Sequence, residues 1–296
     1  MGDNINQGKK TTTEYYDALW SPKKNRAFER EKIVIPAGFH WGLFEKGIKT
    51  MREAMTNMND YVGKLLEINQ YEPKQILDAG CGMGTTSLQL ARKYPNVTFT
   101  GVTLAQNEVL LAKKYSKRLD IKNVNFLKRN FLKTGFSDNC FDGVFALESF
   151  SYANNKKEFV NEMYRILKPG GKLVIIDGFR KPMPPDSSFY KLYKFHCKKR
   201  GGVNLSIKKN FMSQLKSKGF QNFYSKDLSK NITKNFLVRF FDSAPVILKS
   251  IIRLNKTKKY GKKQGNTYNH NLVFLDCFFG LLKISTYDVI IAEKPQ

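Results

Sequence analysis

A short apolar run that ends in an acid and three alternate glycines constrains this 296-residue chain more than any other segment. Residues 76–84 read Ile-Leu-Asp-Ala-Gly-Cys-Gly-Met-Gly. Glycines directly after a strand let the backbone approach a ligand, because a Cβ there would fill the space and forbid the φ angles of the turn. A dinucleotide-binding turn has its third glycine three residues after the second, whereas here the interval is two and an acid precedes the first glycine. The segment therefore predicts a nucleoside site of another kind, with a ligand-free strand-to-helix turn as the alternative.

The segment 74–179 alternates short β-branched or aromatic runs with helical periodicity. This alternation predicts βαβ units and a parallel sheet. Lys168-Pro169-Gly170-Gly171 is a strong helix stop. Strands are expected at 75–79, 97–103, 124–127, 141–147 and 172–177, with helices at 85–94, 106–119 and 158–167.

After residue 177 the chain predicts a proline-rich loop at 179–185 and then helices at 188–199 and 211–218. Strand patterns return around 220–226 and 283–293. These two strands could form the antiparallel edge that completes a seven-stranded sheet, with about 55 residues inserted between them. Ligands of such doubly wound sheets bind at the carboxyl ends of the strands.

Composition limits the class of protein. A content of 41% hydrophobic residues suffices for a sizeable core, and no secretory signal opens the sequence. The apolar stretch 236–254 contains five residues that are charged or proline, so it is not expected to span a membrane. The sequence has only three histidines, and its four cysteines are scattered, at Cys81, Cys140, Cys197 and Cys277. No metal site is therefore expected. Unpaired cysteines fit a reducing compartment, which predicts a cytoplasmic protein.

The net charge of +26 also needs an explanation. From Lys181 onward there are 23 Lys and Arg against six Asp and Glu. Such a surface attracts nucleic acid, anionic membrane or acidic small molecules. The alternative is a lysine-rich composition with solvated side chains that bind nothing specific.

Residues 75–180 resemble the class I S-adenosylmethionine (SAM)-dependent methyltransferases. Four motifs occur in the family's order: the turn from Asp78 to Gly84, Phe141-Asp142 at the start of the fourth strand, Glu148 at its end, and 168–171 before the fifth strand. The resemblance implies SAM as the cofactor. It also implies a Rossmann-like, doubly wound, mostly parallel seven-stranded α/β fold with an N-terminal helical lid and a helical cap near the C-terminus.

Residues 101–104, Gly-Val-Thr-Leu, indicate which group within these methyltransferases the chain resembles. Most members have an acid where this chain has Thr103, because a carboxylate accepts hydrogen bonds from both ribose hydroxyls. Threonine in this context resembles the sterol and tocopherol C-methyltransferases and the cyclopropane fatty acid synthases. That group usually continues with Ser and Gln, where this chain has Ala105 and Glu108, so Glu108 is expected to supply the carboxylate.

The resemblance extends weakly beyond the core. Residues 14–17, Glu-Tyr-Tyr-Asp, and 39–42, Phe-His-Trp-Gly, resemble the N-terminal lid that closes over SAM in this group; a packed N-terminal helix and loop is the alternative. The resulting division is a disordered tail at 1–13, a lid at 14–70, a SAM-binding core at 71–180 and the rest of the sheet at 181–296, with a basic cap at about 227–282.

Catalysis of methyl transfer needs near-attack geometry and a proton acceptor. In the sterol and terpene enzymes that the chain resembles, a glutamate at this place faces the acceptor, so Glu148 is expected to take the proton; a contact to SAM or a turn cap is the alternative. Aromatic side chains would line a cationic intermediate. The predicted catalytic residues are Glu148, His40 and Tyr15, and the predicted substrate-binding residues are Trp41, Phe150, Tyr152 and Phe179. The predicted cofactor-binding residues are Asp78, Gly80, Cys81, Gly82, Gly84, Thr103, Leu104, Glu108, Asn130, Phe131 and Leu147.

The acceptor that these residues favour is a small, largely apolar metabolite, such as an isoprenoid, a lipid or an aromatic natural product. Carbon is preferred because Ser151 and Tyr152 stand where oxygen-methylating relatives carry histidines. N- or O-methylation stays open. Nucleic acid is disfavoured as the methyl acceptor, since residues 147–150 are Leu-Glu-Ser-Phe instead of the Asn/Asp-Pro-Pro-aromatic motif that binds a flipped base. A non-catalytic lipid-binding protein is a further alternative, and weak contact with anionic membrane through the basic C-terminal part is expected.

Overall fold

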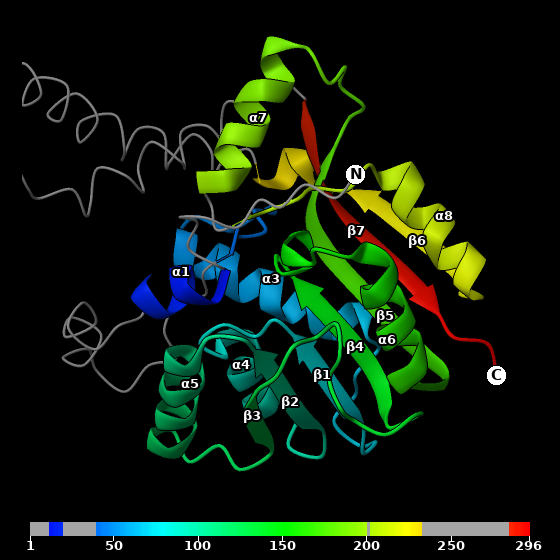
Figure 1. The fold of residues 1–296 in the computed structure, drawn as a ribbon. Coiled ribbons are helices and arrows are strands. Elements are labelled where there is room, and N and C mark those ends of the chain that lie inside the picture. Colours follow the sequence, from blue (N-terminus) through cyan, green and yellow to red (C-terminus); the bar gives the residue numbers. More distant parts are fainter. Residues whose placement is uncertain (1–11, 20–39, 200–201, 233–283) are drawn as a thin grey trace, which may run out of the picture.

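A central seven-stranded sheet with helices on both faces forms the fold (Figure 1). The computed structural model describes residues 12–19, 40–199, 202–232 and 284–296. The predicted tail at 1–13 and the predicted cap at about 227–282 lie mostly outside these residues. No helix in the described part combines the length and apolarity that crossing a bilayer requires.

The strand order is β3-β2-β1-β4-β5-β7-β6. β4 is the central strand and pairs in parallel with β1 and β5; β1 also pairs in parallel with β2, while β7 runs antiparallel to both β5 and β6. The direction of the strand order reverses between β1 and β4, and ligands of open α/β sheets bind at such a reversal. This topology confirms the predicted mostly parallel, doubly wound sheet. The strands are β1 (Gln75–Ala79), β2 (Thr98–Thr103), β3 (Val124–Lys128), β4 (Phe141–Leu147), β5 (Leu167–Arg180), β6 (Gln221–Asp227) and β7 (Ser285–Glu293).

Most helices connect successive strands. A Thr50–Glu53 capping box begins α3, and the Asn155 side chain accepts hydrogen bonds from the first turn of α6, so both starts are fixed locally. The helices are α1 (Thr12–Leu19), α3 (Met51–Leu65), α4 (Thr85–Lys93), α5 (Gln106–Arg118), α6 (Lys156–Ile166), α7 (Ser188–Lys199) and α8 (Lys208–Lys218), with a 3-10 turn η1 (Phe150–Tyr152).

The core has two halves, one on each face of the sheet. On one face α3, α4 and α5 bury side chains such as Met58 and Leu88. On the other face α6 and α8 bury Phe159, Met163 and Phe211. Because both faces are covered, the inner strands are buried on both sides and read as nearly continuous apolar runs.

The largest difference from the predicted strand boundaries is at the start of β5. β5 begins at Leu167, five residues earlier than expected, and Leu167 pairs with Phe141 before the register shifts at Gly143. The Pro-Gly-Gly segment ends α6 as predicted, but its chain then continues beside β4 instead of forming a free loop. Pairing with a neighbouring strand overrode the local turn signal.

Candidate functional site

The glycine turn after β1 is held close to the neighbouring strand. The N–H groups of Gly80 and Cys81 both donate to the carbonyl of Val102, at 2.9 and 3.0 Å. Gly82 and Gly84 have φ angles of +52° and +76°, in the left-handed region that favours glycine. A Cβ on Gly84 would lie 2.4 Å from the Phe126 ring, whereas a Cβ on Gly82 would have Glu108 Oε1 as its nearest neighbour at 3.9 Å. Gly84 is therefore required by packing, and Gly82 leaves space for a ligand.

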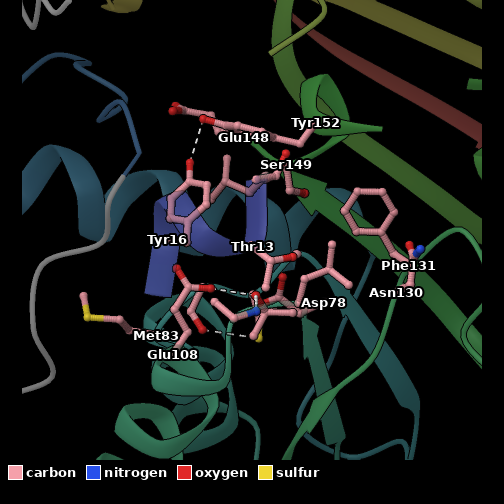
Figure 2. Close-up of a pocket in the computed structure, with 18 of the residues that line it drawn as sticks. Thr13, Tyr16, Asp78, Met83, Glu108, Asn130, Phe131, Glu148, Ser149 and Tyr152 are labelled. Atoms are coloured by element: carbon pink, nitrogen blue, oxygen red, sulfur yellow. Dashed lines mark hydrogen bonds between the residues drawn. The ribbon is translucent and has the colours of Figure 1, made fainter. Parts of the chain in front are cut away.

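A cavity of about 270 Å³ opens at this turn (Figure 2). Its volume is near the lower end of the range for small-molecule sites. Its wall comes from the carboxyl ends of four parallel strands and from α1. The lining positions fall at 80–86 after β1, 103–108 after β2, 130–132 after β3, 147–154 after β4, and at 12, 13, 16 and 40.

One end of the cavity is acidic. Asp78 and Glu108 line it and are only 2% and 4% exposed. Burial raises the pKa of Asp78 to about 7, although the hydroxyl of Ser87 donates to its carboxylate at 2.7 Å. Burial, Asp78 and Glu108 together raise the pKa of the Cys81 thiol. A buried carboxylate whose pKa is raised this far suits a ligand that carries positive charge.

Thr103 and Glu108 act as a pair in this wall. The Thr103 hydroxyl donates to Glu108 Oε2 at 2.6 Å, so the carboxylate of α5 lies directly above the end of β2. α1 is fixed to the same helix, because Asn107 donates its backbone N–H to Asp17 Oδ1 and its amide to the Asp17 carbonyl. The bond to Thr103 thus holds the Glu108 carboxylate at the end of β2 in the cavity wall.

Glu148 lies at the other end of the cavity, where β4 stops (Figure 2). Its backbone has a φ of +51°, a conformation that costs a non-glycine residue about 1–2 kcal/mol. Its Oε1 accepts hydrogen bonds from the backbone N–H of Trp41 at 2.6 Å and from the hydroxyl of Tyr287 at 2.7 Å. Burial and Glu148 raise the pKa of Tyr287, which keeps that hydroxyl protonated as a donor. The carboxylate is therefore oriented by two segments far from it in sequence.

α1 reaches across the cavity to the loop after β4. The Tyr16 hydroxyl donates to the Tyr152 hydroxyl at 2.6 Å, and their rings pack edge to face with centroids 5.5 Å apart (Figure 2). His40 is buried and lines the same cavity, with Nδ1 2.9 Å from the Trp41 carbonyl. These groups surround the Glu148 end with hydroxyls and an imidazole.

Residues 72–244 match a family model described as a methyltransferase domain. The match covers more than half of the chain and includes the glycine turn and Glu148. The chain belongs to the methyltransferase-domain family. Members of the family depend on SAM, so the predicted family and cofactor are confirmed.

Curated relatives of this methyltransferase domain are themselves named as methyltransferases. Methyltransferase phqN of Penicillium fellutanum is 28% identical over 157 residues, 52% of this chain and 48% of that protein. Cycloartenol-C-24-methyltransferase of Arabidopsis thaliana is 25% identical over 232 residues, 77% of this chain and 63% of that protein. The matched part of the chain thus spans about half to two thirds of these relatives.

Solved structures share the fold over nearly the whole chain. The [4+2]-cyclase SpnF superposes with a TM-score of 0.73 at 20% identity and covers 97% of this chain and 98% of its own. Geranyl diphosphate C-methyltransferase from Streptomyces coelicolor, solved with Mg²⁺, geranyl diphosphate and S-adenosyl-L-homocysteine, has a TM-score of 0.70 at 16% identity, with 97% and 100% covered. A cyclase among methyltransferases shows that the fold alone does not fix the reaction.

The structure brings most predicted site residues of the methyltransferase domain to one cavity. Leu104, Asn130, Phe131 and Leu147 line it together with the residues described above. Tyr15 belongs to α1, but its side chain is outside the described part. Among described residues, no group of acids, histidines and cysteines could hold a metal ion.

Three predicted substrate contacts do not line the cavity. Phe150 and Phe179 are fully buried and pack on Phe211, with Phe150 and Phe211 ring centroids 4.3 Å apart. The structure corrects these two positions to core residues: η1 turns Phe150 inward after β4, and Phe179 faces the core from β5. The Trp41 side chain packs against the α3 side of the core, and its contribution to the site is the backbone N–H that Glu148 accepts.

Sequence reasoning missed several residues of the site. Met83, Ser149 and Asn154 lie in the loops whose importance was recognised, so their positions were within reach of the motif argument. The role of Tyr287 could not be predicted in this way, because nothing in the local pattern of β7 distinguishes a tyrosine that contacts Glu148 from one that fills the core.

Proposed function

We propose that this protein transfers a methyl group from SAM to a small, largely apolar metabolite, with carbon as the preferred acceptor atom. The observation that carries the proposal is the position of Glu148. Its carboxylate is held in the cavity wall at the end of β4, in the same cavity as the glycine turn. The names of cycloartenol-C-24-methyltransferase and geranyl diphosphate C-methyltransferase support carbon as the acceptor and an isoprenoid as the class of substrate.

The chain's own residues fit SAM at the acidic end. When bound, SAM supplies an electrophilic methyl group on a positively charged sulfur. Gly82 leaves room for a ligand against the backbone, and the carboxylates of Asp78 and Glu108 compensate positive charge in a buried environment. Glu108 has the acceptor atoms for ribose hydroxyls, with Thr103 fixing its orientation.

Glu148 is proposed as the proton acceptor. Addition of a methyl cation to a carbon–carbon double bond leaves a carbocation, and loss of a proton from a neighbouring carbon restores the double bond. Hydrogen bonds from Trp41 and Tyr287 favour the ionised carboxylate, which then both stabilises the cation and takes the proton. The two donors hold the carboxylate in position before the acceptor arrives.

O- or N-methylation is the second candidate, and His40 is the observation that favours it. An imidazole in the wall of the cavity that Tyr16 and Tyr152 also line could orient a hydroxyl or amine acceptor. Such an acceptor loses its proton from the attacking atom itself, so Glu148 would not be essential.

Removal of the Glu148 charge tests the proposal. Glu148→Gln is expected to lower kcat at least 100-fold, because a general base contributes about 10²–10⁴-fold, while SAM affinity in calorimetry stays within about threefold. Glu158→Gln on the exposed face of α6 is the matched control and is expected to behave like wild type. Turnover of Glu148→Gln near the wild-type rate would remove Glu148 as base and favour the His40 alternative.

A further inference from the structure

Two charged side chains hold one peptide group of the turn that follows Glu148. The Lys156 ammonium donates a hydrogen bond to the Phe150 carbonyl at 2.6 Å. Oδ2 of Asp177 accepts a hydrogen bond from the Ser151 N–H at 2.8 Å. That carbonyl and that N–H belong to the same peptide bond. The Lys156–Asp177 pair therefore fixes this peptide at both of its polar atoms.

The stability of α6 does not explain the place of Lys156. Lys156 is the first residue of α6, where a cation is disfavoured because a helix N-terminus carries partial positive charge. Its neighbour Lys157 is exposed, whereas the Lys156 ammonium lies 4.2 Å from the centre of the buried Phe150 ring. Burial lowers the pKa of Lys156 to about 8, and the charge of Asp177 opposes that shift. Lys156 is thus directed at the turn instead of at solvent.

Asp177 is oriented by its own strand. It lies in β5 with only 3% of its surface exposed, and its Oδ1 accepts a hydrogen bond from the Gly178 N–H at 2.7 Å. Burial raises the pKa of Asp177, whereas the Ser151 and Gly178 N–H groups and the Lys156 charge lower it. The turn after β4 is therefore connected to β5 on one side and to α6 on the other.

The fixed peptide lies between two side chains of the cavity wall. Glu148 stands two residues before Phe150 and Tyr152 directly follows Ser151, and both line the cavity (Figure 2). The φ of +51° at Glu148 is a strained conformation, which persists only when the surrounding structure holds it. Within η1 the hydrogen bonds join residues three apart, a pattern with poorer geometry than that of an α-helix. Contacts from outside the turn are therefore expected to decide its conformation.

We propose that the Lys156–Asp177 pair positions the Glu148 carboxylate for methyl transfer. Neither residue lines the cavity, so both act through the turn. The inference rests on the proposed role of Glu148 as proton acceptor. Without the ammonium, the Phe150 carbonyl loses its charged donor and the peptide is free to rotate. Misplacement of a catalytic group by about 1 Å can lower a rate about 100-fold.

Hydrogen exchange tests the contact with the turn independently of any reaction. Lys156→Met removes the ammonium and keeps an unbranched apolar side chain. We expect the N–H groups of Ser151 and Ala153 to exchange at least about tenfold faster than in wild type, because the turn opens more often. Lys157→Met, at the exposed neighbouring position of the same helix, is the matched control and should exchange at the wild-type rate. Unchanged exchange in Lys156→Met would overturn the inference.

Transfer of a labelled methyl group from SAM, in extracts of the source organism, tests the positioning of Glu148. At a temperature where thermal unfolding shows each variant to be folded, Lys156→Met and Asp177→Asn should lower the initial rate at saturating SAM by about 10- to 100-fold. Calorimetric SAM affinity should stay within about threefold of wild type, and Lys157→Met should match wild type in both measurements.

A double-mutant cycle separates positioning from a general structural role. In a Glu148→Gln background, Lys156→Met should change the remaining rate by less than about threefold, because no carboxylate is left to position. Equal losses in both backgrounds would overturn the inference, as would a wild-type rate in Lys156→Met despite faster exchange. Absence of transfer by the wild-type protein would instead contradict the proposed function, and the exchange measurement would still decide whether the pair holds the turn.

Discussion

Alanine at Gly82 should mainly weaken SAM binding, whereas alanine at Gly84 should mainly lower the stability of the fold. The two glycines are only two residues apart and share left-handed φ angles. In Gly82→Ala the new methyl points into the cavity, with its nearest protein atom, Glu108 Oε1, at 3.9 Å. The folded state then loses only the left-handed preference, about 1–2 kcal/mol. In Gly84→Ala the methyl would lie 2.4 Å from the Phe126 ring, which adds about 1–3 kcal/mol of overpacking to the same backbone cost.

Binding should show the reverse order. A methyl on Gly82 occupies the space proposed for SAM, so we expect Kd to rise at least tenfold, a loss of about 1.4 kcal/mol. Gly84→Ala that remains folded should bind SAM within about threefold of wild type, because its methyl faces the core. Denaturant unfolding and titration calorimetry at one temperature measure the two quantities. Wild-type SAM affinity in Gly82→Ala would refute the placement of the cofactor at this turn.

Three further changes test the site. Tyr287→Phe removes a hydrogen bond to Glu148 Oε1 that favours the ionised carboxylate, so the acid limb of the pH–kcat profile should move upward; an unmoved limb would show that the bond has no catalytic effect. Tyr16→Phe removes the contact with Tyr152 and should weaken SAM binding about fivefold without changing thermal stability, whereas an equal loss of stability would indicate a purely structural contact. Asp78 has a pKa raised from 3.8 to about 7 in the folded protein, so it opposes folding increasingly from about pH 4 to pH 7, by at most about 4 kcal/mol. The unfolding free energy of Asp78→Asn should equal that of wild type near pH 4 and exceed it at pH 7.5, and a difference that does not depend on pH would contradict the burial argument.

Local pattern was enough to predict the elements that carry the cofactor site. β1 and β4 have the predicted bounds, because a buried parallel strand reads as a continuous apolar run with a turn at its end. The helix at 188–199 was predicted from the same kind of periodicity. The positive φ angles at Gly82 and Gly84 follow from the glycine spacing itself.

The acceptor end could not be predicted in the same way. An aromatic residue after a strand gives the same sequence pattern whether its side chain faces a cavity or the core. For Phe150, only its packing on Phe211 decides between the two. The bond from Tyr287 to Glu148 joins residues 139 positions apart and depends on the antiparallel pairing of β7 with β5. Contacts of this kind are set by the assembled sheet and leave no local signal.

The most direct measurement is transfer of label from SAM that carries ¹³C in its methyl group, after incubation of the protein with extracts of its source organism. We expect one small apolar metabolite that gains a ¹³C methyl bound to carbon, together with S-adenosylhomocysteine. The label should appear with wild type and with Glu158→Gln, and be lost with Glu148→Gln. Tight SAM binding without any labelled product in active extracts would contradict an enzymatic role, and a label on nitrogen or oxygen that persists in Glu148→Gln would contradict the proposed chemistry.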